Sequence, residues 1–153
     1  MKLLFTGASG FLGRNIYQLL EKTYVIKTAG LTSQDYYKID IARNIPVFTE
    51  VFDIVLHAAG KAHSTPKTEE EKQVFFDVNL QGTKNLCTAL EQSGIPKAFI
   101  FISSVAVYGC DSGENITEEH PLNGTTPYAL SKIKAEKYLE RWCAMHNVAL
   151  SIL

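Results

Sequence analysis

Apolar runs of strand length alternate with longer helical patterns along almost the whole chain. The predicted strands are apolar throughout, which is typical of a parallel sheet that helices cover on both sides. Right-handed crossovers between such strands give a doubly wound α/β fold of the Rossmann type. The predicted strands span residues 2–6, 24–27, 37–39, 53–58, 98–102 and 148–153. The predicted helices span residues 11–20, 69–92 and 127–146.

Length and composition indicate one globular domain over residues 1–153. A net charge of -1 provides no broad positive field for nucleic acid or an anionic membrane surface. Three widely spaced cysteines are typical of reduced thiols, and neither a targeting segment nor a membrane-length apolar run is visible. We therefore expect a cytoplasmic protein without nucleic-acid or membrane partners. We also expect no metal site, because no metal-ligand spacing relates His57, His63, His120 and His146.

A glycine-rich turn, T-G-A-S-G-F-L-G, joins the first predicted strand to the first helix. Gly7 permits the tight turn, Gly10 lets the backbone approach a diphosphate, and Gly13 allows the helix to pack closely on the strand. The free N–H groups and the dipole of the helix start favour an anion. The turn therefore predicts a dinucleotide-binding site. Its predicted binding residues are Gly7, Ser9, Gly10, Phe11, Leu12 and Gly13.

Four further motifs follow in order along the chain. They are Asp40-Ile41, His57-Ala58-Ala59-Gly60 with the later Asn79, Ser103-Ser104 with Tyr108-Gly109, and Tyr128-x-x-x-Lys132. With the G-x-x-G-x-x-G turn, they resemble the extended short-chain dehydrogenases/reductases, the NAD-dependent epimerase/dehydratase family. The resemblance implies that Asp40 and Ile41 contact the adenine and that the segment after the fourth strand flanks the cofactor ribose. The cofactor-binding residues that it implies beyond the turn are Asp40, Ile41, Ala58, Ala59, Gly60, Asn79, Ser103, Tyr128 and Lys132.

The end of the second predicted strand leaves the choice of cofactor open. Residues 27–31 read K-T-A-G-L and lack the acid with which many NAD-using members bind the ribose 2′-hydroxyl. Lys27, or a hydroxyl of Thr28, Thr32 or Ser33, is an alternative partner for a 2′-phosphate. We expect NAD or NADP as cofactor, with NAD preferred.

Tyr128 and Lys132 lie four residues apart on the last predicted helix, so their side chains rise from the same face. A tyrosine hydroxyl ordinarily has a pKa of about 10, and a nearby ammonium group lowers such a pKa by stabilising the phenolate. Such a tyrosine takes a proton from a substrate hydroxyl and returns it in the reverse step. By the resemblance, Ser104 hydrogen-bonds the reacting oxygen. The predicted catalytic residues are Ser104, Tyr128 and Lys132.

Val105 and Ala106 stand where sugar dehydratases of this branch carry an Asp-Glu pair, and neither residue moves a proton. The resemblance therefore implies a nucleotide-sugar 4-epimerase of the UDP-sugar type, with an NADPH-dependent carbonyl or sugar reductase as the alternative. It also implies a homodimer through the two long helices. Extended members are longer than this chain and bind the nucleotide-sugar largely through their carboxyl-terminal half, so we expect that region to be missing here. An alternative of a different class is a non-catalytic dinucleotide-binding module.

Overall fold

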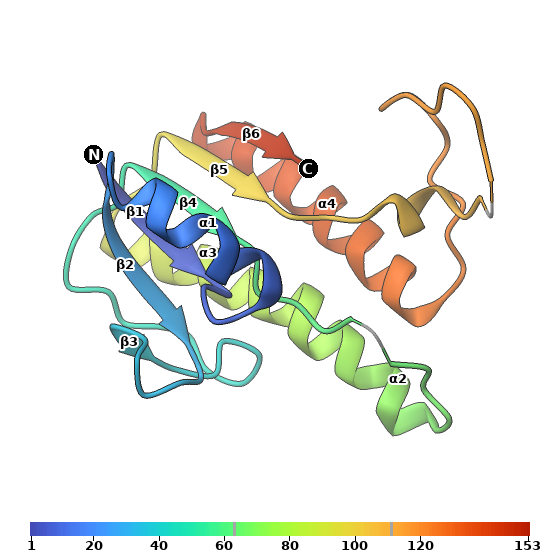
Figure 1. Ribbon diagram of the computed structural model, residues 1–153, viewed down its shortest axis with the longest axis horizontal. Helices are drawn as coiled ribbons and strands as arrows, with labels where there is room; N and C mark the ends of the chain where they lie inside the picture. The colour runs from blue at the N-terminus through green and yellow to red at the C-terminus, as the bar shows by residue number, and fades with distance from the viewer. Residues whose placement is uncertain (63, 111) are drawn as a thin grey trace.

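The computed structural model describes residues 1–62, 64–110 and 112–153. Within them, six parallel strands form one sheet in the order β3-β2-β1-β4-β5-β6 (Figure 1). The strands are β1 (Lys2–Thr6), β2 (Val25–Gly30), β3 (Tyr37–Lys38), β4 (Ile54–His57), β5 (Ala98–Phe101) and β6 (Ala149–Ile152). The helices are α1 (Phe11–Leu20), α2 (Glu69–Phe76), α3 (Gly82–Ser93) and α4 (Pro127–His146), with a π-helical turn η1 (Asp77–Gln81) and a 3-10 turn η2 (Val105–Tyr108). The predicted Rossmann-type fold is confirmed.

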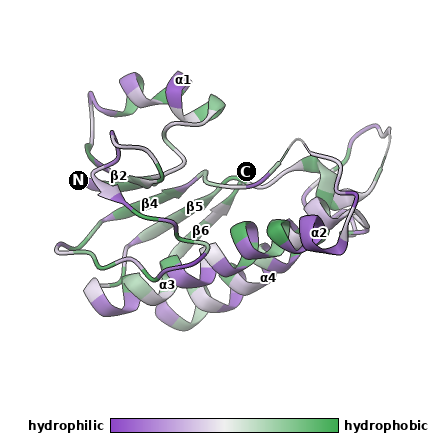
Figure 2. Cartoon of the chain, turned by 90° about the horizontal axis from the view of Figure 1, so that it is seen from below, coloured by the Kyte–Doolittle hydropathy of each residue, from purple (hydrophilic) through white to green (hydrophobic). Residues whose placement is uncertain are grey.

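Helices cover the sheet on both faces, with α1 on one side and α3 and α4 on the other (Figure 2). Side chains of a strand alternate between the two faces, so each strand supplies both layers. In β1, Leu3 and Phe5 pack in the α1 layer, whereas Leu4 belongs to the larger cluster under α3 and α4. The apolar character of the strands on both faces therefore follows from their burial between two helical layers.

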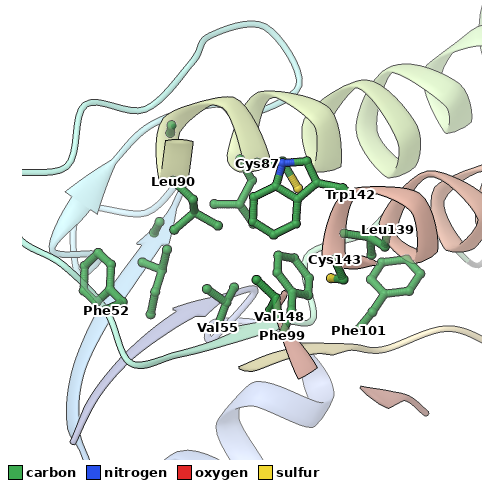
Figure 3. Packing of buried hydrophobic residues seen from close by; sticks show 14 of the residues in the cluster. Phe52, Val55, Cys87, Leu90, Phe99, Phe101, Leu139, Trp142, Cys143 and Val148 are labelled. Atoms are coloured by element: carbon green, nitrogen blue, oxygen red, sulfur yellow. The ribbon is translucent and has the colours of Figure 1, made fainter. Parts of the chain in front are cut away.

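The larger core lies between the sheet and the paired helices α3 and α4 (Figure 3). The Trp142 ring packs against Phe99, with 6.2 Å between ring centroids, and its indole N–H donates to Glu91 Oε1 at 2.7 Å. Cys87 and Cys143 are free thiols inside this core. Burial raises the pKa of Cys143 to about 11, so this thiol packs as a small apolar group.

Strand β2 extends three residues beyond the predicted segment 24–27. Its carboxyl-terminal half pairs with strands on both sides: Ala29 is opposite Thr6 of β1 and opposite Tyr37 of β3. Ala29 and Gly30 have weak strand propensity, and the tertiary pairing outweighs it. The strand therefore ends at Gly30, near the glycine-rich turn, and not three residues earlier at Lys27.

The predicted single helix over 69–92 is interrupted by the π-helical turn η1. Hydrophobic periodicity did not reveal this turn, because the apolar residues on either side of it still fit one continuous helical pattern in the sequence. The turn contains Asn79, which is 1% exposed and directs its side chain toward α4 and toward the segment after β4. Interruptions of this kind are frequent at functional sites, and this one lies beneath the candidate site.

Helix α4 begins as predicted. The Thr126 hydroxyl caps it by accepting a bond from the Ala129 N–H at 3.1 Å, and Pro127 occupies the first helical position. Asn147, in the left-handed conformation with φ 55°, ends it. The preceding segment 110–126 has no helix or strand in its described residues, and Asp111 lies outside them. Across the described ranges, no helix is long and apolar enough to cross a membrane.

Candidate active site

The glycine-rich turn closes tightly against the ends of β1 and β4. Gly7 has φ +78°, and a Cβ there would lie 2.5 Å from the Ala59 nitrogen. Gly13 is buried within α1, and a Cβ there would lie 2.4 Å from the Ala8 oxygen. Gly10 is different, because a Cβ would meet only the Gly7 oxygen, at 3.2 Å. Gly7 and Gly13 therefore hold the shape of the turn, and Gly10 leaves its surface open.

The start of α1 presents backbone donors to this open surface. No described side chain caps the helix at Gly10, and its first turn holds no acidic residue. The N–H groups of a first helical turn have no acceptor within the helix, and the dipole makes this end positive. Phe11 and Leu12, which the sequence predicts as binding residues, do not line the adjoining cavity.

A cavity of about 500 Å³ opens at the carboxyl ends of β1, β2 and β4. Eight predicted residues line it: Gly7, Ser9, Gly10, Asp40, Ile41, Ala58, Ala59 and Gly60. The lining also includes eight that were not predicted as binding residues: Ala29, Leu31, Ile39, Ala42, Arg43, Val74, Asp77 and Val78. Its position at the point where the strand order reverses is where open α/β sheets bind their ligands.

The segment after β3 is fixed at one side of this cavity. Asp40 Oδ1 accepts a bond from the Ala42 N–H at 3.0 Å, and Arg43 Nε lies 3.6 Å from Oδ2. The Ile41 carbonyl accepts a bond from Asn85 Nδ2 at 2.7 Å, which ties the segment to α3. The positions of Asp40 and Ile41 are therefore fixed by contacts that each involve a side chain, and they are compatible with the predicted adenine contact.

A buried hydrogen-bond chain links β1, β4 and α3 through His57. Thr6 Oγ1 lies 2.6 Å from His57 Nδ1 and 3.3 Å from the Ala59 nitrogen, and Thr83 Oγ1 lies 2.9 Å from His57 Nε2. Thr83 donates to the Asn79 carbonyl at 2.7 Å, so its oxygen accepts from Nε2–H, and Nδ1 accepts from the Thr6 hydroxyl. Burial lowers the pKa of His57 to about 3, with the charge of Lys132 acting in the same direction. The imidazole is therefore a neutral structural link.

Asn79 joins three segments beneath the site. Its Oδ1 accepts from the Lys61 N–H at 2.7 Å, and its Nδ2 donates to the Lys61 carbonyl at 3.1 Å and to Ser131 Oγ at 2.8 Å. A Cβ on Gly60 would lie 3.1 Å from Asn79 Oδ1 and 3.2 Å from Lys132 Nζ. Asn79 does not line the cavity. It holds the segment after β4 against α4.

Lys132 is the most perturbed cationic group of the site. Its side chain is buried, its Nζ donates to the Ile102 carbonyl at 2.8 Å, and it lies 4.6 Å from the centroid of the Phe101 ring. Burial lowers the pKa of this ammonium group to about 8, against the opposite effect of Glu136. Tyr128, one helical turn earlier, is half-buried with its ring centroid 6.2 Å from that of Phe75.

Ser103 and Ser104 follow β5 and line a second cavity of about 290 Å³, beside η2 and α4. Ser104 Oγ accepts from the Ala106 N–H at 3.2 Å and caps η2. Ser103 Oγ hydrogen-bonds the buried Glu136 carboxyl, whose pKa is raised by burial. No hydrogen bond joins Ser104, Tyr128 and Lys132 in the part of the chain that the structure describes. The structure thus brings Lys132, Asn79 and Gly60 together and leaves Ser104 in the adjacent cavity.

Besides residues that line the larger cavity, sequence reasoning missed three polar groups near the site. Thr6 and Thr83 gave no signal, because single threonines in a strand and a helix have many roles. Glu136 follows Lys132 by one helical turn, so the same helix face was a usable indication. Among the described residues no cluster of His, Cys, Asp or Glu is arranged to hold a metal ion, and His63 lies outside them.

The strand order, the glycine-rich turn and the cavity at the strand ends define a Rossmann-type α/β domain. The sequence profile of the NAD dependent epimerase/dehydratase family matches residues 3–153. The chain therefore belongs to this family, as its motifs predict.

Comparison with characterised proteins agrees with this assignment. The N-acetyl-α-D-glucosaminyl-diphospho-ditrans,octacis-undecaprenol 4-epimerase of Escherichia coli O157:H7 is 34% identical over 92% of this chain and 43% of its own length. The structure of RMD from Pseudomonas aeruginosa with NADPH is 28% identical, with a TM-score of 0.79 over 99% of this chain and 53% of that one. The Thermus thermophilus UDP-glucose 4-epimerase with NAD is 25% identical, with a TM-score of 0.81 over 99% and 54%. The chain spans about half the length of these relatives.

Proposed function

We propose that the whole protein is an NAD(P)-dependent nucleotide-sugar 4-epimerase and that residues 1–153 form its cofactor-binding and catalytic part. The observation that carries the proposal is the buried Lys132 ammonium group, one helical turn from Tyr128 and 3.2 Å from where a Gly60 Cβ would lie. A cation in this position stabilises a neighbouring phenolate and so supports a tyrosine as a general base. The similarity to 4-epimerases supports the reaction type.

The residues present fit a nicotinamide dinucleotide. The cavity of about 500 Å³ adjoins an uncapped helix start, and a side chain at Gly10 would project at this open surface. The turn residues would hold the diphosphate, Asp40 and Ile41 the adenine, and the segment after β4 the ribose. When bound, the cofactor supplies the hydride acceptor and donor of the reaction.

The side chains of this chain supply the proton chemistry. Tyr128 takes the proton of the sugar 4-hydroxyl when the sugar carbon is oxidised and returns it when the opposite face is reduced. Lys132 holds the phenolate form through its charge, and the Ile102 carbonyl fixes the ammonium group. Ser104, at the start of η2, would hydrogen-bond the reacting oxygen once the bound sugar lies between the two cavities.

We further propose a cytoplasmic homodimer that assembles through the layer of α2, α3 and α4. Free cysteines inside the core suit a reducing compartment. Light scattering of the purified protein would give twice the monomer mass if the pairing is right, and the monomer mass would contradict it.

The reaction is tested by incubating the protein with UDP-N-acetylglucosamine or UDP-glucose and NAD⁺, and separating the 4-epimers. An epimerase yields the 4-epimer with no net change in reduced cofactor. Consumption of NADPH in proportion to product would instead establish the reductase, and binding of the cofactor without any product would favour the non-catalytic module.

A further inference from the structure

A third cavity, of about 450 Å³, lies beside the glycine-rich turn, between α1 and the segment that follows β2. It shares Ser9 with the dinucleotide cavity, so the two adjoin at the turn. The remaining lining consists of Ala8, Arg14, Tyr17, Thr28, Thr32, Gln34 and Asp35. In this fold the adenosine ribose lies at the end of the second strand, so its 2′ position faces such a space.

The Asp35 carboxyl group occupies the position that a side chain at the end of β2 would take. Gly30 is the last residue of that strand, and a Cβ there would lie 2.7 Å from Asp35 Oδ2 and 3.1 Å from Oδ1. The space is open to Asp35 only because residue 30 is glycine. A carboxylate thus stands at the end of the second strand although the strand itself contains no acid.

Thr32 fixes this carboxylate from one side only. Its backbone N–H donates to Asp35 Oδ2 at 3.0 Å, and its hydroxyl donates to the same oxygen at 2.7 Å. Both bonds fall on Oδ2, so within the described residues Oδ1 is left to accept a bond from a ligand. The carboxylate is held in place before any ligand binds, which reduces the ordering cost of binding.

We infer that Asp35 selects NAD over NADP by accepting a hydrogen bond from the ribose 2′-hydroxyl and repelling a 2′-phosphate. This inference rests on the proposed function, because it requires a dinucleotide in the larger cavity. The strand-end acid that the sequence lacks is replaced by an acid from the following segment. An anionic phosphate beside a fixed carboxylate is opposed by like-charge repulsion.

The two nearby cationic side chains are poorly placed to bind a 2′-phosphate in this cavity. Lys27, which the sequence offers as a phosphate partner, has its Nζ 3.5 Å above the Tyr36 ring centroid and does not line the cavity. Arg14 lines it but is solvent-exposed, and it forms no ion pair with a described residue. An exposed guanidinium group attracts a 2′-phosphate only weakly because solvent screens its charge, whereas two hydrogen bonds hold the Asp35 carboxylate in place.

The test is the pair of dissociation constants for NAD⁺ and NADP⁺, measured by isothermal titration calorimetry on the full-length protein. We expect NAD⁺ to bind roughly tenfold or more tightly than NADP⁺ in the wild type. Asp35→Asn keeps the shape and an acceptor for the Thr32 N–H, and it should reduce the preference by roughly tenfold, mainly by strengthening NADP⁺ binding. Arg14→Gln is the matched variant in the same cavity and should leave the preference for NAD⁺ in place.

A wild type that prefers NADP⁺, an unchanged ratio in Asp35→Asn, or no binding of either dinucleotide would overturn the inference. Circular dichroism of each variant shows that its fold is retained. Thr32→Val, which removes one of the two bonds to Asp35, provides a second variant and should weaken the preference to a smaller extent. Selective NAD⁺ binding without any 4-epimer formation would refute the proposed function and leave this inference standing.

Discussion

The buried histidine His57 should make the folded protein sensitive to mild acid. It is 0% exposed and sits between Thr6 and Thr83 as a neutral hydrogen-bonding group. Burial lowers its pKa from 6.5 to about 3 in the folded state, whereas the unfolded chain titrates at the ordinary value. The unfolded state therefore binds more protons between these two values, and the stability that neutral His57 contributes is lost as the pH falls below about 6.5.

The size of this effect follows from one proton and the two pKa values. Each pH unit within the window is worth about 1.4 kcal/mol, so His57 alone should cost about 2.5 kcal/mol between pH 7 and pH 4.5. Carboxyl groups whose pKa values are lowered by ion pairing, such as Asp53, add a loss of the same sign at low pH. A comparison with a variant that cannot titrate at this position separates the two contributions.

His57→Gln supplies that comparison, because a glutamine side chain is polar and neutral throughout the range. Urea denaturation followed by circular dichroism and Trp142 fluorescence gives the free energy of unfolding at each pH. The wild type should lose about 2.5 kcal/mol more than His57→Gln between pH 7 and 4.5. His120→Gln, outside this hydrogen-bond chain, should lose as much as the wild type. Equal losses in His57→Gln and wild type would refute the buried neutral imidazole.

Three further substitutions separate folding from function. Lys132→Met should abolish activity and raise the free energy of unfolding at pH 7 by about 1–2 kcal/mol, because it removes a buried charge. Burial lowers the pKa of this lysine to about 8, so the gain in stability should vanish above pH 10, where the wild-type side chain is neutral. Urea denaturation at pH 7 and above pH 10 measures both values. Gly13→Ala should cost about 2 kcal/mol or more, since its Cβ would lie 2.4 Å from a backbone oxygen. Gly10→Ala should have a free energy of unfolding within about 1 kcal/mol of the wild type but bind the dinucleotide roughly tenfold more weakly. Urea denaturation and calorimetry of both glycine variants test this, and a larger loss of stability in Gly10→Ala than in Gly13→Ala would contradict it.

The strand and helix pattern was readable because burial between two helical layers leaves a strong apolar signal. The signal failed where neighbours, not propensity, decide the structure. The last residues of β2 (Val25–Gly30) join the strand because they pair with strands on both sides. The π-helical turn at Asp77–Gln81 lies within an otherwise regular helical pattern, so the sequence gives no sign of it. The predicted start of the last helix at residue 127 is confirmed, because proline suits the first helical position and a threonine hydroxyl precedes it as the cap.

The candidate site was predictable where spacing carries the geometry. Gly7 and Gly13 face backbone atoms that leave no room for a Cβ, and Lys132 follows Tyr128 at the interval that places both on one helix face. Contacts between distant segments were not readable. Asp35 reaches the end of β2 because of how its own segment folds back on Gly30, and a linear sequence gives no sign of that contact. From the sequence, no acid was found at this strand end, because Asp35 lies five residues beyond Gly30 in the chain.

The central claim is that Tyr128, supported by Lys132, moves the proton of the epimerisation. The most direct measurement is kcat for 4-epimer formation by Tyr128→Phe in the full-length protein, together with its NAD⁺ dissociation constant. The account predicts a fall in kcat of roughly 10²- to 10⁴-fold with the dissociation constant nearly unchanged. A variant that keeps close to wild-type kcat would contradict it.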